Sequence, residues 1–231
     1  MATLNEIVFN IRRLAKAGAD LTDDAVPPFK QVAFWVNYYR ALLIKRDIDK
    51  GRTINTDVET DLGCVELKLV DKAECCTVRA GCKVLRTVKK IPKLVEFAHT
   101  NALTFVGLID KVTQFQVTNP VKSVWSKYNR YLNQANEAFQ LNEYVYVLNN
   151  SILQYINIRG IFEDPMAAVG FNTCEGVPCY TEDSQYPMAA WMLPAVTELI
   201  LTKELRMVLA TPADVTNDAK NQSPTSPEPK T

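Results

Sequence analysis

The chain has 231 residues, of which 47% are apolar, 9% aromatic and 23% charged, and its 26 basic residues equal its 26 acidic ones. This content supplies a buried core and excludes a wholly disordered protein, while the zero net charge excludes a nucleic-acid binder that is basic over its whole surface. His99 is the single histidine, and the scarcity of this usual base and metal ligand weighs against an enzyme.

The first predicted element is an amphipathic helix over about residues 4–17. Thr3 and Glu6 have the spacing of a capping box, in which each side chain accepts a hydrogen bond from the other's backbone amide. The predicted buried stripe consists of Leu4, Ile7, Val8, Ile11, Leu14 and Ala15. Gly18 supplies a stop. Charged residues interrupt this segment, so it predicts a helix and not a secretory signal.

A long second helix is predicted between Pro28 and Gly51, because proline fits a first turn and no Gly or Pro interrupts the segment. Its stripe consists of Val32, Trp35, Val36, Tyr39, Leu42, Leu43 and Arg46. Tyr38 lies beside this stripe, and together with Arg40 it has the composition of an interface anchor. Aromatic side chains on helices belong to a core more often than to a binding surface, and this interpretation covers Trp35, Tyr38, Tyr39 and Trp191, with the interface anchor as the alternative for Tyr38.

From Thr53 onward the helical period gives way to alternation. Residues 65–69 (VELKL) alternate between apolar and charged side chains, as a half-buried strand does. Further strands are predicted at residues 83–88, 104–109, 114–118, 138–141, 144–148 and 155–161. Turn-forming residues predict a hairpin or meander within residues 137–162. A short helix is expected at residues 120–136.

The helical period returns near the C-terminal end. Pro187 and Pro194 punctuate an apolar stretch, and Pro194 either starts a helix or kinks a longer one. The stripe continues through Ala195, Leu199, Ile200, Leu205, Val208 and Leu209. Beyond Thr211 the chain is rich in Pro, Ser and Thr, so it buries too little to offset its ordering entropy and is expected to be flexible.

This order of elements predicts an α+β protein. We expect residues 1–52 and 186–210 to pack as a helical domain, residues 53–185 to form a β-rich insertion domain, and residues 211–231 to form a flexible tail. The longest uncharged run, residues 144–158, is too short and too rich in amides for a membrane span, so the chain is expected to be soluble.

Six cysteines stand at positions 64, 75, 76, 82, 174 and 179. We expect unpaired thiols in a reducing compartment, because no secretory signal is predicted. A zinc site built from them and His99 is the alternative, although no Cys-x-x-Cys spacing is present. His99 is otherwise interpreted as a structural or surface residue. No phosphate-binding glycine motif occurs, and no catalytic residue, cofactor or metal ligand is assigned.

One stretch, residues 77–93, carries a single sign of charge. Its basic side chains are Arg79, Lys83, Arg86, Lys89, Lys90 and Lys93. Contact with DNA phosphates or with an acidic partner is one interpretation. The other, which we favour, is a strand pair whose charged face is solvated.

Three strings resemble virion structural proteins of crAss-like podoviruses and related phages of Bacteroidetes. They are residues 35–44 (WVNYYRALLI), 159–165 (RGIFEDP) and 186–188 (YPM). The order of helix, long helix, β-rich insertion and terminal helix resembles the head-to-tail adaptor or tail ring proteins that stack beneath the portal. The resemblance covers most of residues 1–210.

The resemblance implies a non-enzymatic component of the virion, in the tail or at the head-tail junction, that is made in the cytoplasm of the host bacterium. It implies a homo-oligomeric ring, twelvefold as expected from a match to the portal, with the portal protein and other tail or ring proteins as partners. Packaged DNA would pass through the channel, and no membrane is involved. Tyr38, Arg40 and the basic side chains are the expected interface or channel residues. Two alternatives remain: a DNA-binding accessory protein acting through residues 77–93, and a small cysteine-based metalloprotein.

Overall fold

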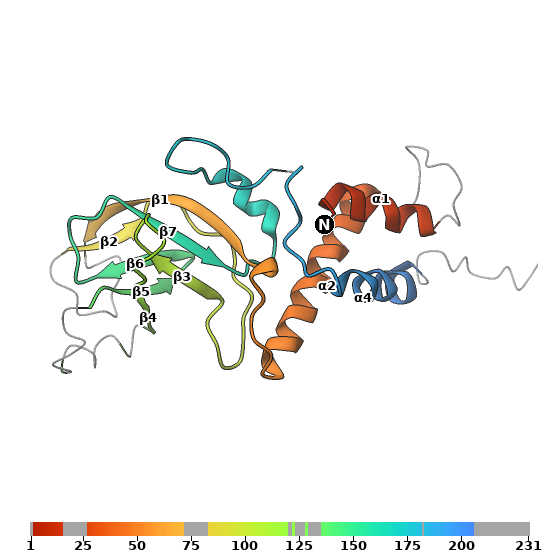
Figure 1. The fold of residues 1–231 in the computed structure, drawn as a ribbon, viewed down its shortest axis with the longest axis horizontal. Helices are drawn as coiled ribbons and strands as arrows, with labels where there is room; N and C mark the ends of the chain where they lie inside the picture. The colour runs from red at the N-terminus through yellow and green to blue at the C-terminus, as the bar shows by residue number, and fades with distance from the viewer. Residues whose placement is uncertain are drawn as a thin grey trace, which may run out of the picture.

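The computed structural model describes residues 2–15, 27–71, 83–119, 135–181 and 183–205, together with Lys122 and Tyr128. The chain is mixed in secondary structure, with a helical N-terminal region, a β-rich middle and a further helix after it. Figure 1 shows the helices at one end of an elongated molecule and the strands at the other. The predicted order of helices, strands and helix is therefore confirmed.

The helices are α1 (Leu4–Ala15), α2 (Phe29–Asp49) and α4 (Met192–Leu199), which continues as the π-helix η4 (Ile200–Leu205). Two short 3-10 helices, η1 (Thr56–Val58) and η3 (Pro165–Gly170), lie in the connections. Pro194 stands in the first turn of α4, where its missing amide costs no hydrogen bond. Within the described residues, no helix has the length and apolar character that a membrane crossing requires.

The capping box at the start of α1 is confirmed. The Thr3 amide donates to Glu6 Oε2 at 3.0 Å, and the Glu6 amide donates to Thr3 Oγ1 at 3.2 Å. The predicted stripe of α1 is buried as far as Ile11, but Leu14 near the helix end is 58% exposed, so that part of the prediction is wrong. In α2 the stripe is buried from Val32 to Tyr39, whereas Arg46 is exposed.

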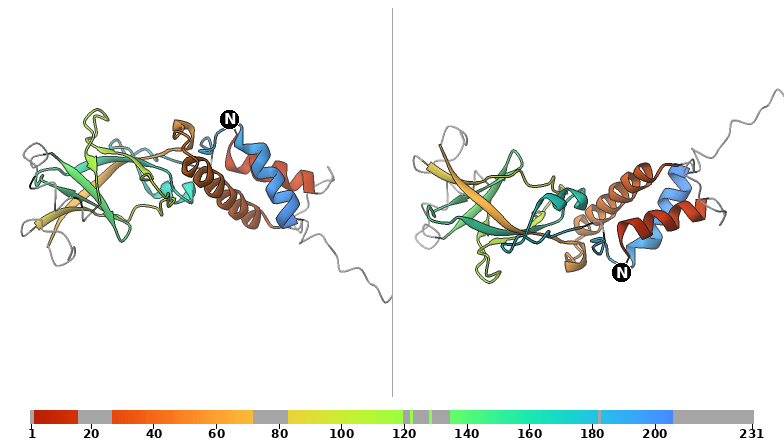
Figure 2. Two further views of the ribbon diagram at one scale, coloured as in Figure 1. Left: turned by 90° about the horizontal axis from the view of Figure 1, so that it is seen from below. Right: turned by 90° about the horizontal axis from the view of Figure 1, so that it is seen from above.

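One buried apolar cluster joins the helices. Its helical members include Leu4, Ile7, Val8, Ile11, Val32, Trp35, Val36, Tyr39, Met192, Val196, Ile200 and Leu205. Both views of Figure 2 place α1 and α4 beside α2. The amphipathic faces read from the sequence thus cover one another, which is how short helices gain most of their stability.

The strands form one seven-stranded sheet in the order β3-β7-β1-β2-β6-β5-β4. Their bounds are β1 (Thr60–Asp71), β2 (Lys83–Thr87), β3 (Leu103–Gly107), β4 (Gln116–Val117), β5 (Glu137–Leu141), β6 (Tyr144–Leu148) and β7 (Tyr155–Gly160). The two edge strands also meet, because the Phe115 amide donates to the Val106 carbonyl at 2.7 Å and Gly107 bridges to Gln114. The sheet is therefore a nearly closed barrel. Every predicted strand is present, but β1 has 12 residues and begins at Thr60 instead of Val65, and β4 has only two residues.

The turn between β5 and β6 is the predicted hairpin. Asn142 and Glu143 have φ angles of 51° and 65°, and two positive values are what the turns that best match strand twist require. The meander alternative is wrong, because β7 does not pair with β6 but lies between β3 and β1. The long strand β1 pairs with both β7 and β2 and so separates β7 from its neighbour in sequence.

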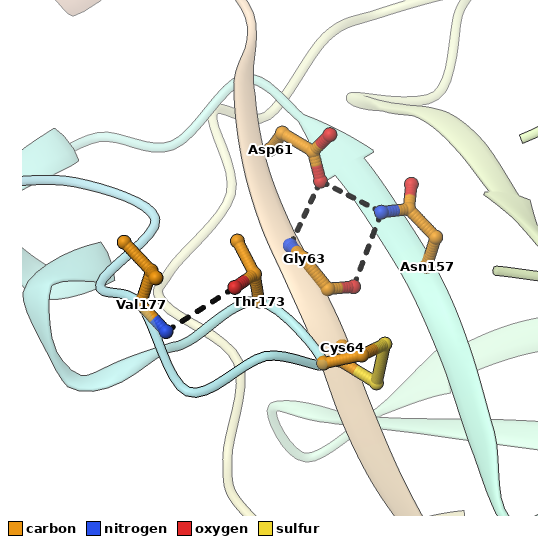
Figure 3. The surroundings of a disulfide bond; sticks show 7 residues. Asp61, Gly63, Cys64, Asn157, Thr173 and Val177 are labelled. Carbon is orange, nitrogen blue, oxygen red and sulfur yellow. Dashed lines mark hydrogen bonds between the residues drawn. A yellow bond between two sulfur atoms is a disulfide. The ribbon is translucent and has the colours of Figure 1, made fainter.

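The prediction of unpaired cysteines is wrong for two of them. Cys64 on β1 and Cys174 in the loop after η3 form a disulfide across 110 residues (Figure 3). The loop is held against β1 because the Cys64 amide donates to the Asn172 carbonyl at 3.0 Å. Cys179 is free, and burial raises the pKa of its thiol.

Several predicted features lie outside the described residues. They are the cysteines at positions 75, 76 and 82, Arg79, the tail at residues 211–231 and most of the helix predicted at 120–136. His99 is exposed in a bend, as its interpretation as a surface residue predicts. Within the described parts of the chain, no three His, Cys, Asp or Glu side chains come together as a metal site would require.

Candidate interaction surfaces

Arg40 lies inside the molecule and not on its surface, so its prediction as an interface or channel residue is wrong. Its side chain on α2 is fully buried. Nη1 donates to the Phe162 carbonyl and Nη2 to the Val58 carbonyl, each at 2.9 Å, and Nε donates to the Pro187 carbonyl. A buried guanidinium needs such partners, since its desolvation is costly.

The three carbonyls bound by Arg40 belong to three segments of the chain that connect helices and strands. Val58 lies between α2 and β1, Phe162 follows β7, and Pro187 precedes α4. The Tyr186 ring lies 5.6 Å from the guanidinium carbon. Burial lowers the pKa of Arg40, but the carbonyls and the ring compensate its charge. Arg40 therefore fastens the chain crossings between the helical end and the barrel.

Tyr38, by contrast, is exposed as its prediction requires. It is 53% exposed, and Phe34 one turn before it on α2 is 62% exposed. We call this pair the aromatic ridge. The two side chains line a groove of about 430 Å³, whose opposite wall consists of Lys93, Val95, Glu96, Glu163 and Asp164. The groove brings Tyr38 and Lys93 together, two predicted site residues that are far apart in the sequence.

The groove walls are held by polar contacts. Asn37 Nδ2 donates to Asp164 Oδ1 at 3.0 Å, and the Tyr186 hydroxyl donates to the amide oxygen of Asn37. Asp164 also accepts from the Met166 amide at 2.9 Å, while Lys93 pairs with Glu163 at 3.1 Å. These bonds fix the loop after β7 against α2, so the groove has a rigid shape.

The exposure of a further aromatic residue, Trp191, was not predicted. Trp191 is 55% exposed, so its interpretation as core is wrong, whereas Trp35 and Tyr39 are buried as predicted. Trp191 is the N-cap of α4, and helical periodicity makes no prediction for a residue before the first turn. The Arg52 guanidinium carbon lies 5.9 Å from the Trp191 ring centroid, and Arg52 pairs with Asp47 at 3.4 Å.

Arg52 and Trp191 stand on a second groove, of about 490 Å³. Its apolar lining comes from α2, from the connection that contains η1 and from the start of α4, and includes Ile44, Ile48, Ile54, Val58 and Met192. Trp, Tyr and Arg are the residues that most often anchor protein interfaces. The helical end thus presents two aromatic surfaces that share no lining residue.

Most of the basic side chains of residues 77–93 that the structure describes have different local partners. Arg86 lies 4.3 Å from the Tyr144 ring, Lys89 donates to the Gly170 carbonyl at 3.0 Å, and Lys90 pairs with Glu143 at 2.9 Å. The hydrogen bond with Glu143 raises the pKa of Lys90 and lowers that of the carboxyl. Lys83 is exposed at the start of β2, and Arg79 lies outside the described residues. These local pairs weaken the segment as a row of phosphate contacts.

Two comparisons with known sequences identify relatives of this chain. The family model for phage tail ring protein 2 matches residues 6–223. A curated relative, Ring protein 2 of Bacteroides phage crAss001, is 24% identical over 229 residues, which cover 96% of this chain and 98% of the relative. The match spans both the helical end and the barrel and confirms the resemblance to tail ring proteins of crAss-like phages. The chain therefore belongs to the phage tail ring protein 2 family, whose members are structural proteins of the virion and not enzymes.

Proposed function

We propose that this chain is the repeated subunit of a closed ring that lies between the portal and the tail, around a channel for packaged DNA. Twelve copies would match the portal, and the portal protein and other tail or ring proteins would be the neighbours. Assembly would take place in the cytoplasm of the host bacterium. The family supports a ring, and a ring requires that different faces of one chain meet in neighbouring copies.

We assign the subunit contacts to the helical domain, residues 1–52 with 186–210, together with the groove wall at residues 93–96 and 163–164. The rest of the β-rich domain, residues 53–185, would form the layer projecting from the ring. The tail, residues 211–231, would order on a neighbouring subunit. The observation that carries this assignment is the pair of exposed aromatic surfaces around Tyr38 and Trp191 on the helical end. Large aromatic residues exposed on a rigid frame are typical of the centres of interfaces.

Electron cryo-microscopy of purified virions tests the ring. We expect twelve copies of the fold in one layer below the portal, with the helices lateral and the barrel projecting. Peptides of this chain should be found in the same particles by mass spectrometry. Density for the fold in the capsid shell, or the absence of the chain from the particles, would contradict the proposal.

The DNA channel requires a separate test. We propose that Lys83, Arg86, Lys89 and Lys90 face the channel, at a distance that leaves their local pairs intact, whereas Lys93 lies in the groove beside Tyr38. Lys83→Glu with Lys89→Glu should then lower genome retention in assembled virions, and the effect should shrink as salt is raised because phosphate contacts are screened. Equal retention in the variant and the parent at low salt would remove this role.

A further inference from the structure

We infer that the Arg52–Trp191 surface of one copy docks on the aromatic ridge of the next copy in the ring. This inference rests on the proposed function, which requires two complementary faces on one chain. The two surfaces meet that requirement because both are built on α2, yet they share no lining residue. A second copy of this chain is thus the occupant to which the inference commits.

The ridge groove has the size and lining that a tryptophan side chain requires. Its volume of about 430 Å³ lies in the range of sites that enclose ligand-sized groups. Phe34, Tyr38 and Leu42 form one wall, and Val95 contributes to the other. An indole ring that packs edge-to-face on Phe34 or Tyr38 gains aromatic contact in addition to the burial of its area.

The charges of the two surfaces are complementary. The ridge groove contains three carboxylates, Glu96, Glu163 and Asp164, against two lysines, Lys45 and Lys93. Since Lys93 pairs with Glu163 and Asp164 is held by Asn37, the exposed Glu96 remains at the rim for a cation from outside. Arg52, whose side chain is 65% exposed beside Trp191, supplies that cation.

The docking side chains are ordered before contact. Asp47 pairs with Arg52 and directs its guanidinium toward the Trp191 ring. The ridge is rigid as well, because Tyr38 stands on a long helix and the opposite wall is fixed by the Asp164 bonds. Surfaces that are ordered in the free subunit lose less entropy on association, which favours a specific contact of modest area.

Photo-cross-linking in virions tests the contact. Phage is grown with p-benzoylphenylalanine in place of Trp191, irradiated, and digested for peptide mapping. We expect a product of twice the chain mass whose cross-linked peptide contains Phe34 or Tyr38. The same probe in place of Tyr155 on the barrel is the control, and should give no product at the ridge.

The outcomes separate this inference from the proposed function. The docking surface alone would be overturned if the micrographs show a ring but Trp191 cross-links to another part of the chain or to a different virion protein, or gives no cross-link. Virions in which this chain forms no ring would overturn both.

Charge reversal gives an independent test. Arg52→Glu and Glu96→Arg should each reduce the copies per virion at least about tenfold, because two like charges then face each other across the contact. The double variant should recover most of the loss, since each copy then presents the reversed pair to its neighbour. Lys68→Glu, an exposed reversal on β1 of the barrel, is the matched control. Circular dichroism confirms folding of each variant, and a folded double variant that is no better than the single ones contradicts the contact.

Discussion

The two ends of the molecule differ in the kind of large apolar side chain that each exposes. Among the described residues of the helical end these are mostly aromatic: Phe9, Leu14, Phe29, Phe34, Tyr38 and Trp191. Those of the β-rich middle are mostly aliphatic: Leu69, Val88, Ile109, Val112, Tyr128, Ile152, Tyr155, Val169 and Val177. Aromatic residues concentrate where interfaces have their centres, while scattered aliphatic residues are normal on any surface. The comparison supports the proposal that the subunit contacts lie mainly at the helical end.

The two ends also differ in what holds them together. The helices depend on one apolar cluster, whereas the barrel adds a disulfide and a partly buried polar network at its long central strand. In that network Asp61 Oδ1 accepts from the Gly63 amide and from Asn157 Nδ2, each at 2.8 Å (Figure 3). Substitutions that lower the stability of one end and leave the other intact would support this division. Substitutions that destabilise both ends together would contradict it.

The largest effect is expected from loss of the disulfide. Cys64→Ser with Cys174→Ser should lower the free energy of unfolding of the oxidised protein by about 3–4 kcal/mol, because the bond closes a loop of more than 100 residues in the unfolded chain. Denaturant titration followed by circular dichroism measures the change. The difference should vanish in a reducing buffer, and a difference that persists there would assign the loss to packing.

Arg40→Met tests the junction between the ends. It leaves three buried carbonyls without their donor and should cost about 3 kcal/mol. Two separate unfolding transitions should replace one, since this side chain binds every crossing between helices and barrel. Arg46→Met, an exposed arginine on the same helix, is the control and should be nearly neutral. A single transition and a small loss in both variants would contradict the assigned role.

Alanine substitution of two glycines with positive φ distinguishes the cost of backbone strain from the cost of steric overlap. A Cβ at Gly63 (φ +66°) would overlap Cys179 Sγ and approach the Asn172 carbonyl oxygen to 2.9 Å, whereas at Gly51 (φ +84°) it would meet open space. Gly63→Ala should therefore cost about 2 kcal/mol more than Gly51→Ala, which carries the backbone strain alone. Equal thermal shifts in the two variants would show that the loop moves away at no cost.

The capping box gives a smaller, local effect at the helical end. Thr3→Ala removes the acceptor for the Glu6 amide and should cost about 1 kcal/mol, while Thr3→Ser should retain most of the stability. Hydrogen exchange should report faster exchange in the first turn of α1 and unchanged rates in the barrel. Faster exchange in the strands would break the division between the ends.

The smallest effect is expected at Asp61. Burial by itself would raise the pKa of this carboxyl, but hydrogen bonds from Lys111, Gly63 and Asn157 hold it below its ordinary value of 3.8. The resulting stability is present above that value and is lost as the pH falls through the lowered pKa. Lys111→Met should cost less than about 1 kcal/mol at neutral pH, because the pair is partly exposed. The deficit should shrink on acidification, and a deficit independent of pH would exclude this origin.

The local elements of this protein follow from its sequence. The capping box at Thr3, the buried stripe from Val32 to Tyr39 and the strands from residue 60 to 160 depend on neighbours only a few positions apart. The exposed position of Tyr38 follows on the same basis, since this residue lies off the stripe of its helix. These features were predicted correctly because helical and strand periods are properties of short segments.

Only the tertiary structure decided where distant segments meet. It placed β7 between β3 and β1, joined Cys64 to Cys174, buried Arg40 against carbonyls from three separate segments and left Trp191 exposed beside Arg52. These outcomes depend mostly on contacts between residues far apart in the sequence, such as Gly107 with Asn157 and Arg40 with Pro187, and no short-range pattern records them. Burial of a charge is favourable only where the fold assembles its partners, so the sequence determined the elements and the tertiary contacts decided the surfaces.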